Sequence, residues 1–166
     1  MLEIITSAAE AYRDVIPADL WHEPYMGSAE LDAQIAAGVL FLGAIVDDRL
    51  TGVMGIQRVD DVELIRHAYV RPDAQRSGIG GALLDHLIGT ATRPLLVGTW
   101  AAATWAIAFY ERHGFVRASP EDARALLRRY WDIPDRQIET SVVLLLGAEA
   151  RRRKDVLPRQ YAPGAE

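Results

Sequence analysis

The chain has 166 residues, of which half are hydrophobic and a quarter are charged, and its formal net charge is −5. These values are typical of one globular domain and argue against a general nucleic-acid binder, whose surface would be basic. The absence of cysteine excludes disulfides, thiolate zinc sites and cysteine nucleophiles. We find no signal-peptide pattern and no apolar run of membrane length, and therefore expect a cytoplasmic protein without a membrane partner.

The first 38 residues predict one short strand and two helices. Residues 2–5 (LEII) form the strand candidate, and a helix capped by Ser7 should follow and end at Pro17. An irregular segment rich in aromatic side chains leads to a second helix, which Ser28 caps and Gly38 ends.

Three strand-like segments come next, at residues 39–46, 50–59 and 62–70. Asp-Asp pairs at 47–48 and 60–61 separate them, and aspartate is a common residue of tight turns. The sequence therefore predicts an antiparallel meander.

The order of elements then changes. A glycine-rich loop at residues 75–81 precedes a helix, because apolar side chains recur at helical spacing over residues 79–88. The apolar segment 94–100 is the next strand. A strand, loop, helix and strand in this order predict a parallel pair of strands.

Three more elements complete the chain: a helix around residues 106–113, a helix over 120–131, and a long apolar final strand at 137–146. The fold class is thus α/β of the α+β kind, with a mixed, mostly antiparallel central sheet, one parallel strand pair and flanking helices. We expect one domain over residues 1–147 and a polar C-terminal extension over 148–166.

The glycine-rich loop (QRSGIGG, residues 75–81) has the chemistry of an anion site. Glycine lets the backbone approach a ligand closely, and the first N–H groups of a helix have no internal partner and bind phosphate. Gln75 and Arg76 add donors. The loop lacks the lysine of a Walker loop, and Leu83 stands where a dinucleotide fingerprint needs glycine. A tight turn without a ligand is the alternative.

Two motifs resemble the GNAT superfamily of acyl-CoA-dependent N-acetyltransferases. Gln75, Gly78 and Gly80 fill the pattern Gln/Arg-x-x-Gly-x-Gly/Ala of its acyl-CoA pyrophosphate loop. Residues 105–115 (WAIAFYERHGF) resemble its signature Ala-x-x-Phe-Tyr-x-x-x-Gly-Phe. The meander and the final strand also fit, so the resemblance covers roughly residues 1–147. The stretches LIRHAYVRP and LLRRYWDIPDRQIETSVVL further resemble a bacterial branch of this superfamily.

The resemblance implies transfer of an acetyl group from acetyl-CoA, a cosubstrate, to a primary amine of a small molecule or peptide by direct attack in a ternary complex, without a metal. The loop would hold the pyrophosphate, and the pantetheine arm would lie between the splayed parallel strands. The implied cofactor-binding residues are Tyr69, Val70, Arg71, Gln75, Arg76, Ser77, Gly78, Ile79, Gly80, Gly81 and Thr104. Many members carry an asparagine where this chain has Ala103, and Thr99 or Thr104 could substitute. A noncatalytic acyl-CoA-binding or regulatory module is the alternative function.

The implied catalytic residues are Tyr110 and a base. Tyr110 matches the tyrosine that protonates the leaving CoA thiolate, and a packing role is the alternative. His67 and Glu63 alternate onto one face of the strand at 62–70 but lie roughly 13 Å apart, so they are alternative bases beside a water chain.

The acceptor would lie beside the aromatic segment near residue 22 and the end of the helix at 120–131. The candidate substrate-binding residues are Trp21, His22, Glu23, Tyr25, Tyr130 and Trp131. Glu23 could pair with a cationic amine, and a tryptophan could face one. Core and rim aromatics are the alternative interpretation. The apolar run VVLLL allows either a homodimer or burial within the domain.

Overall fold

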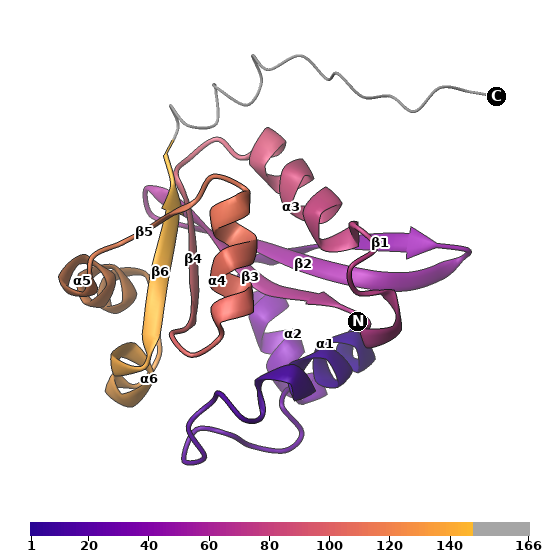
Figure 1. Cartoon of the computed structure of the whole chain (residues 1–166), viewed down its shortest axis with the longest axis horizontal. Helices are drawn as coiled ribbons and strands as arrows, with labels where there is room; N and C mark the ends of the chain where they lie inside the picture. Colours follow the sequence, from indigo (N-terminus) through magenta and orange to yellow (C-terminus); the bar gives the residue numbers. More distant parts are fainter. Residues whose placement is uncertain (148–166) are drawn as a thin grey trace.

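The computed structural model describes residues 1–147, so the predicted C-terminal extension lies outside the described residues. A six-stranded sheet in the order β1-β2-β3-β4-β6-β5 forms its centre (Figure 1). Its strands are β1 (Val39–Val46), β2 (Arg49–Val59), β3 (Val62–Val70), β4 (Leu95–Trp100), β5 (Val116–Arg117) and β6 (Ser141–Leu146). Only β3 and β4 run parallel, and the other neighbouring pairs are antiparallel. The predicted fold class is confirmed.

Helices cover both faces of the sheet. They are α1 (Leu2–Ala9), α2 (Ser28–Ala36), α3 (Ile79–Thr90), α4 (Thr104–Arg112), α5 (Pro120–Tyr130) and α6 (Asp135–Glu139), with short 3-10 turns η1 (Glu10–Tyr12) and η2 (Pro72–Ala74). Figure 1 shows α4 in front of the sheet and α2 behind it. Helices α3 and α4 pack on the largest apolar cluster, which includes Leu84 and Ile107. On the other face, Leu127 of α5 and Ile5 of α1 belong to two smaller clusters.

The meander has the tight turns that the sequence predicts. Asp47 and Asp48 have φ values of 49° and 57°, and Asp60 has a φ of 46°. Aspartate tolerates this left-handed conformation, which matches the right-handed twist of paired strands. The two hairpins therefore bring β1, β2 and β3 together in sequence order.

The N-terminal prediction is wrong. Residues 2–5 begin α1, and Ser7 lies within this helix, where its hydroxyl donates to the carbonyl of Ile4. The buried residues Ile4, Ile5, Ala8 and Ala9 form a helical stripe. A run of four mostly apolar residues fits a strand or a helix equally well, and here packing against β2 and β3 selects the helix.

The last strand begins later than predicted. Residues 137–139 belong to α6, which starts after Pro134, and Ile138 packs into the cluster beneath α5. Strand β6 starts at Ser141 and lies between β4 and β5, with most of its apolar run buried within the domain. None of the helices in residues 1–147 is long and apolar enough to cross a lipid bilayer.

Two irregularities in β3 shape the centre of the molecule. Strands β3 and β4 pair only over Glu63–Ile65 and Leu95–Val97 and then diverge. Beyond that point a bulge interrupts the pairing of β3 with β2, and His67 within it has a φ of 51°. The predicted alternation of Glu63 and His67 onto one face therefore fails, because the bulge shifts the residues after Arg66 by one position.

Candidate active site

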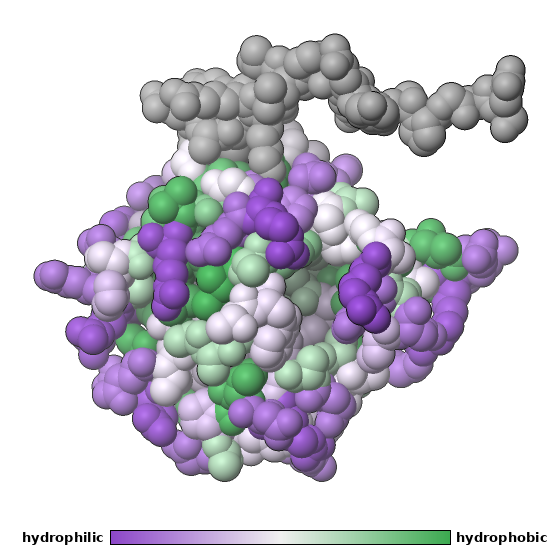
Figure 2. Space-filling view, in the orientation of Figure 1, coloured by the Kyte–Doolittle hydropathy of each residue, from purple (hydrophilic) through white to green (hydrophobic). Residues whose placement is uncertain are grey.

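A cleft of about 770 Å³ lies between the glycine-rich loop, the end of β3 and α4. In Figure 2 the front of the molecule is hollowed beside α4. Its lining includes Tyr69, Val70, Gln75, Arg76, Gly78, Ile79, Gly80 and Gly81 on one side and Trp105, Ala106, Phe109, Tyr110, Arg112 and His113 on the other. The two segments that the sequence singled out thus face each other across one cavity.

The loop presents backbone N–H groups at the start of α3. Arg76 and Gly78 both adopt left-handed conformations, with φ values of 63° and 88°. Ala82 donates its amide to the carbonyl of Gly78, whereas the earlier amides of the first helical turn have no acceptor within the helix. Such a turn entering a helix forms a concave set of donors with partial positive charge, which suits an anion.

Side chains hold this loop in place. Gln75 donates to the carbonyl of Val70 at 3.2 Å, and Ser77 donates to the carbonyl of Ala74. Ser77 is therefore engaged within the loop. Arg71 turns toward α1, where it pairs with Glu3 at 2.9 Å.

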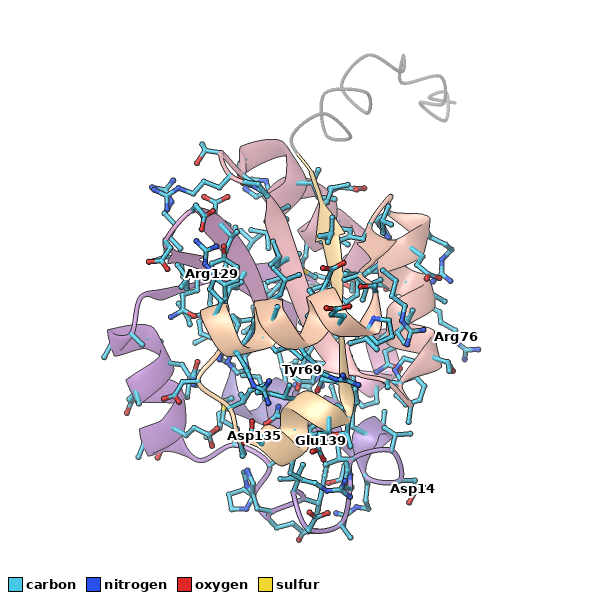
Figure 3. All side chains as sticks on the ribbon, turned by 90° about the vertical axis from the view of Figure 1, so that its left-hand side faces the viewer. Asp14, Tyr69, Arg76, Arg129, Asp135 and Glu139 are labelled. Carbon is cyan, nitrogen blue, oxygen red and sulfur yellow. The ribbon has the colours of Figure 1, made fainter. Side chains whose placement is uncertain are left out.

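A second pocket, of about 180 Å³, lies where β3 and β4 separate. Tyr12, Ala68, Tyr69 and Tyr110 line both this pocket and the cleft, so the two cavities meet at these residues. Figure 3 shows Tyr69 in the interior, seen through the space between α5 and α6, and Arg76 pointing outward at the right-hand edge. The gap between the two parallel strands connects the loop side of the sheet with its opposite side.

Tyrosine hydroxyls surround the junction of the two cavities. Tyr69 donates to the hydroxyl of Tyr25 at 3.0 Å, and the rings of Tyr12 and Tyr69 meet edge to face at 6.4 Å. Burial raises the pKa of Tyr12 to about 12 and also raises the pKa of Tyr69 and of Tyr110 above the ordinary value. These phenols are therefore protonated at neutral pH and can act as proton donors.

The residues that match the family model span this site. Residues 37–117 match the model described as the acetyltransferase (GNAT) domain. The chain has a GNAT acetyltransferase domain. The predicted family is thereby confirmed, and the match includes the glycine-rich loop and all of α4.

Solved structures share the fold of this GNAT domain. A GNAT-family acetyltransferase from Staphylococcus aureus Mu50 has a TM-score of 0.64 at 19% identity, covering 88% of this chain and 89% of that chain. The PaiA N-acetyltransferase from Thermoplasma acidophilum, solved with coenzyme A, has a TM-score of 0.60 at 18% identity, covering 88% and 92%. A GNAT-family acetyltransferase from Elizabethkingia anophelis with acetyl-CoA bound has a TM-score of 0.57 at 23% identity, covering 80% and 90%. No curated protein matches the sequence.

Position 103 departs from the GNAT pattern noted above. Ala103 is buried and precedes α4 without a side-chain cap. Of the two threonines that could substitute for the asparagine, Thr99 lines the second pocket, whereas Thr104 lines neither cavity.

His67 lies in the bulge of β3 and lines the second pocket. Its ring stacks on Phe41 at 5.8 Å, and its Nε2 lies 3.4 Å from Oε1 of Gln34. Burial, with a smaller contribution from Arg66, lowers the pKa of His67 to about 4. The imidazole is therefore uncharged at neutral pH.

The depressed pKa of His67 makes stability depend on pH. Between the folded pKa of about 4 and the unfolded pKa of about 6.5, the unfolded chain binds a proton that the native protein does not, so stability is lost as the pH falls. We expect His67 to account for a loss of about 2 kcal/mol in the free energy of unfolding between pH 7.5 and pH 5.0. His67→Asn, whose side chain tolerates the left-handed backbone, should remove this share in urea titrations.

His86→Asn is the matched control, because His86 is exposed on α3. This variant should keep the pH dependence of the wild-type protein. If His67→Asn kept it as well, His67 would not be the buried group that titrates.

Glu63 lies at the opposite end of β3 and lines neither cavity. Glu63 is only 2% exposed, and its carboxylate accepts hydrogen bonds from Arg58 Nε at 3.1 Å and from the backbone N of Thr92 at 3.1 Å. Thr92 Oγ1 donates as well, at 3.3 Å. This geometry gives Glu63 a structural role, linking β3 to the loop before β4, and we do not propose it as the base.

Glu63→Ala should destabilise the GNAT domain without removing its ligand site. The change deletes the acceptor of a buried network, and we expect the free energy of unfolding to fall by roughly 2–3 kcal/mol in urea titrations. Affinity for CoA, measured by calorimetry where the variant is folded, should stay within about twofold of wild type, since a distant site adds no ligand contact. A wild-type stability would contradict the structural role, and a selective loss of affinity would return Glu63 to the site.

The residues that the sequence suggested for the acceptor separate into two groups. Tyr25 and Trp131 line the second pocket. Glu23 lies outside it and pairs with Arg13 at 2.6 Å, and Trp21 lies beneath the same guanidinium. Tyr130 also lies outside it.

Two of these outlying residues bond elsewhere. The Nδ1 of His22 lies 2.9 Å from the carbonyl of Pro24. Tyr130 donates to Asp61 at 2.7 Å.

Several cavity residues escaped the sequence interpretation. Tyr12 lies on η1, directly after α1, and the sequence predicted a strand where α1 begins. Trp105 of α4 packs against Tyr12, with ring centroids 5.4 Å apart. Arg66 lines the second pocket as well.

Proposed function

We propose that this GNAT domain transfers an acetyl group from acetyl-CoA to a primary amine by direct attack in a ternary complex. One observation carries the proposal. The cleft at the glycine-rich loop and the second pocket meet at Tyr12, Ala68, Tyr69 and Tyr110. A thioester that enters from one cavity and an amine that enters from the other would therefore come into contact at this junction.

The cleft suits the acyl-CoA. The loop amides at the start of α3 offer donors for the pyrophosphate, and Arg76 adds positive charge at the rim. Past Ile65 no described strand pairs with the β4-facing edge of β3, so the backbone near Tyr69 and Val70 can pair with the pantetheine arm as an added strand would. CoA in the Thermoplasma structure and acetyl-CoA in the Elizabethkingia structure support this assignment.

Tyr110 supplies the proton for the leaving group. The amine nitrogen bonds to the thioester carbon, the carbon–sulfur bond breaks, and the thiolate takes a proton from the phenol. Since burial raises the pKa of Tyr110, the phenol stays protonated throughout the usual assay range.

The attacking amine must be neutral, so it loses one proton to His67 or to water. His67 is the lining imidazole of the second pocket and is uncharged at neutral pH. The low pKa of His67 makes the imidazole a weak base. His67 therefore accepts the proton most readily from an amine whose own pKa is lowered by the pocket around it.

A thiol-release screen tests the proposal. Purified protein is mixed with acetyl-CoA and single acceptors from a panel of amino acids, peptide N-termini, polyamines and aminoglycosides. We expect acceptor-dependent release of CoA thiol, with a mass increase of one acetyl group on the acceptor. CoA binding without release across the whole panel would instead support a noncatalytic acyl-CoA-binding module.

A further inference from the structure

The second pocket has an uneven charge. Among its lining residues are an arginine, Arg66, and a neutral histidine, His67, but no aspartate or glutamate. A pocket built for a polyamine or an aminoglycoside needs carboxylates, because a cation that leaves water must be compensated. The lining of this pocket compensates an anion.

Arg66 has no carboxylate partner among the described residues. Its Nη1 donates to Oε1 of Gln57 at 2.9 Å, and its Nη2 donates to Oε1 of Gln34 at 3.0 Å. Both partners are uncharged amides. Arg58 and Arg71, on the neighbouring strand and just past β3, do pair with carboxylates. Two glutamine side chains therefore hold the guanidinium in position and leave its charge unneutralised.

The electrostatic surroundings of Arg66 agree with the absence of a carboxylate partner. Burial lowers the pKa of Arg66, and the charge of Arg66 contributes to the lowered pKa of His67. Both effects arise where a cation is poorly hydrated and has no counter-ion. An anion bound there would gain a charge-assisted hydrogen bond.

Three carboxylates on segments close in sequence to lining residues are already paired with arginines. Glu23, which the sequence suggested for an acceptor amine, bonds to Arg13 at 2.6 Å. On α6, Asp135 pairs with Arg128 at 3.2 Å. On the same helix Glu139 approaches Arg136 at 4.0 Å. None of these three carboxylates pairs with Arg66.

Apolar and aromatic side chains form part of the remaining wall of the second pocket: Tyr25, Trp100, Leu127, Trp131 and Ile133. Thr99, Gln137 and Ser141 add polar groups to this wall. The volume of about 180 Å³ suits a molecule of amino-acid size better than a folded protein surface. The pocket therefore combines one cationic side chain, Arg66, with a partly apolar, aromatic wall, and it meets the cleft at Tyr110.

We propose that the acceptor is a free amino acid with an apolar or aromatic side chain, whose carboxylate pairs with Arg66 while its amine faces Tyr110. This inference rests on the proposed acetyl transfer and names its substrate class. The same positive charge disfavours a second cation in the pocket, so it also favours the neutral, attacking form of the amine. A weak base such as His67 is then sufficient to take the proton from the amine.

The test compares acceptors that differ only in the carboxylate. Phenylalanine, phenylalanine amide and 2-phenylethylamine are assayed by thiol release, followed by other apolar amino acids with their amides. We expect kcat/KM for the amino acid to exceed that for either analogue by about 10- to 100-fold, the range for one charged hydrogen-bonding pair. The amide has the less basic amine, so a preference for the acid cannot come from a larger neutral fraction.

Arg66 variants identify the group responsible. Arg66→Met should reduce the ratio between amino acid and amide to near one, and Arg66→Lys should keep part of it. Affinity for CoA should be unchanged in both, because Arg66 does not line the cleft. If Arg66→Met fails to fold, the wild-type ratio and the Arg66→Lys variant still decide the question.

The outcomes separate this inference from the proposed function. Efficient acetylation of polyamines, aminoglycosides or amidated amines, with no preference for the carboxylate, would overturn the amino-acid assignment and leave the acetyltransferase activity standing. Arg66→Met with an unchanged preference would also overturn it. If no acceptor in the panel caused release of CoA thiol, both proposals would be overturned.

Discussion

Gly80→Asp should weaken CoA binding at least 100-fold while the domain stays folded. Gly80 lies in the first turn of α3, where the loop amides face the cleft. An added Cβ would lie 3.6 Å from Val70 and 3.7 Å from the ring of Phe109, which are ordinary contacts. A carboxylate suits the N-terminus of a helix and therefore preserves the fold, but it takes the place of the pyrophosphate and repels it. Calorimetry with CoA and a thermal melt measure the two effects.

Two control variants separate charge from bulk. Gly80→Ala adds only the methyl group, and we expect a loss of affinity below about tenfold. Gly89→Asp adds the same charge near the other end of α3, where nothing lies within 4 Å of the new Cβ, and it should leave CoA affinity unchanged. Unchanged affinity in Gly80→Asp would move the pyrophosphate away from this loop.

Local chemistry made much of the fold predictable. The aspartates at 47–48 and 60 take left-handed turn conformations, so the meander followed from short-range signals. The glycine-rich loop was predictable for the same reason, since Gly78 has a φ of 88° and precedes the helix directly. In each case the residue that adopts the left-handed conformation is itself of a type that favours it, so a few neighbouring positions are enough for the prediction.

Features set by distant packing were not predictable. Residues 2–5 fold as a helix because they meet β2 and β3, which lie some 50 residues onward. The sequence made Glu63 a candidate base, but the backbone N of Thr92, 29 residues away, donates to its carboxylate. The amide of Gln34 that holds Arg66 is 32 residues from it. Such pairs leave no periodic trace in the sequence.

The bulge in β3 illustrates the same limit within one strand. Its residues read as a regular alternation, and nothing in HAYV marks an extra residue. The bulge appears just past the point where β3 leaves β4, and it turns His67 toward the Gln34 amide oxygen that also accepts from Arg66. The candidate site therefore differs from the sequence prediction mainly on the acceptor side, where contacts come from α2, β2 and α5.

Tyr110→Phe should slow acetyl transfer by roughly 100-fold with little change in stability or CoA affinity. The ring contacts Phe109 and Phe115 at centroid distances of 5.1 and 5.5 Å, and phenylalanine keeps both contacts. Within residues 1–147 the hydroxyl has no hydrogen-bond partner, and the residue lines both cavities. Single-turnover rates are the proper measurement, because slow product release could hide a slower chemical step.

Tyr12→Phe is the matched control, because Tyr12 also lines both cavities but packs against Trp105. If Tyr110 is the acid, Tyr12→Phe should retain the single-turnover rate within about fivefold, since no proton passes through it. The opposite order of effects would make Tyr12 the acid. Full rates in both variants would mean that water or the acceptor's own ammonium protonates the thiolate.

The effect of Tyr110→Phe on the single-turnover rate should be equally large at pH 7 and pH 9, because burial keeps the Tyr110 phenol protonated over this range. If an amine or a histidine that titrates in this range were the acid instead, the ratio of the wild-type rate to the variant rate would change with pH.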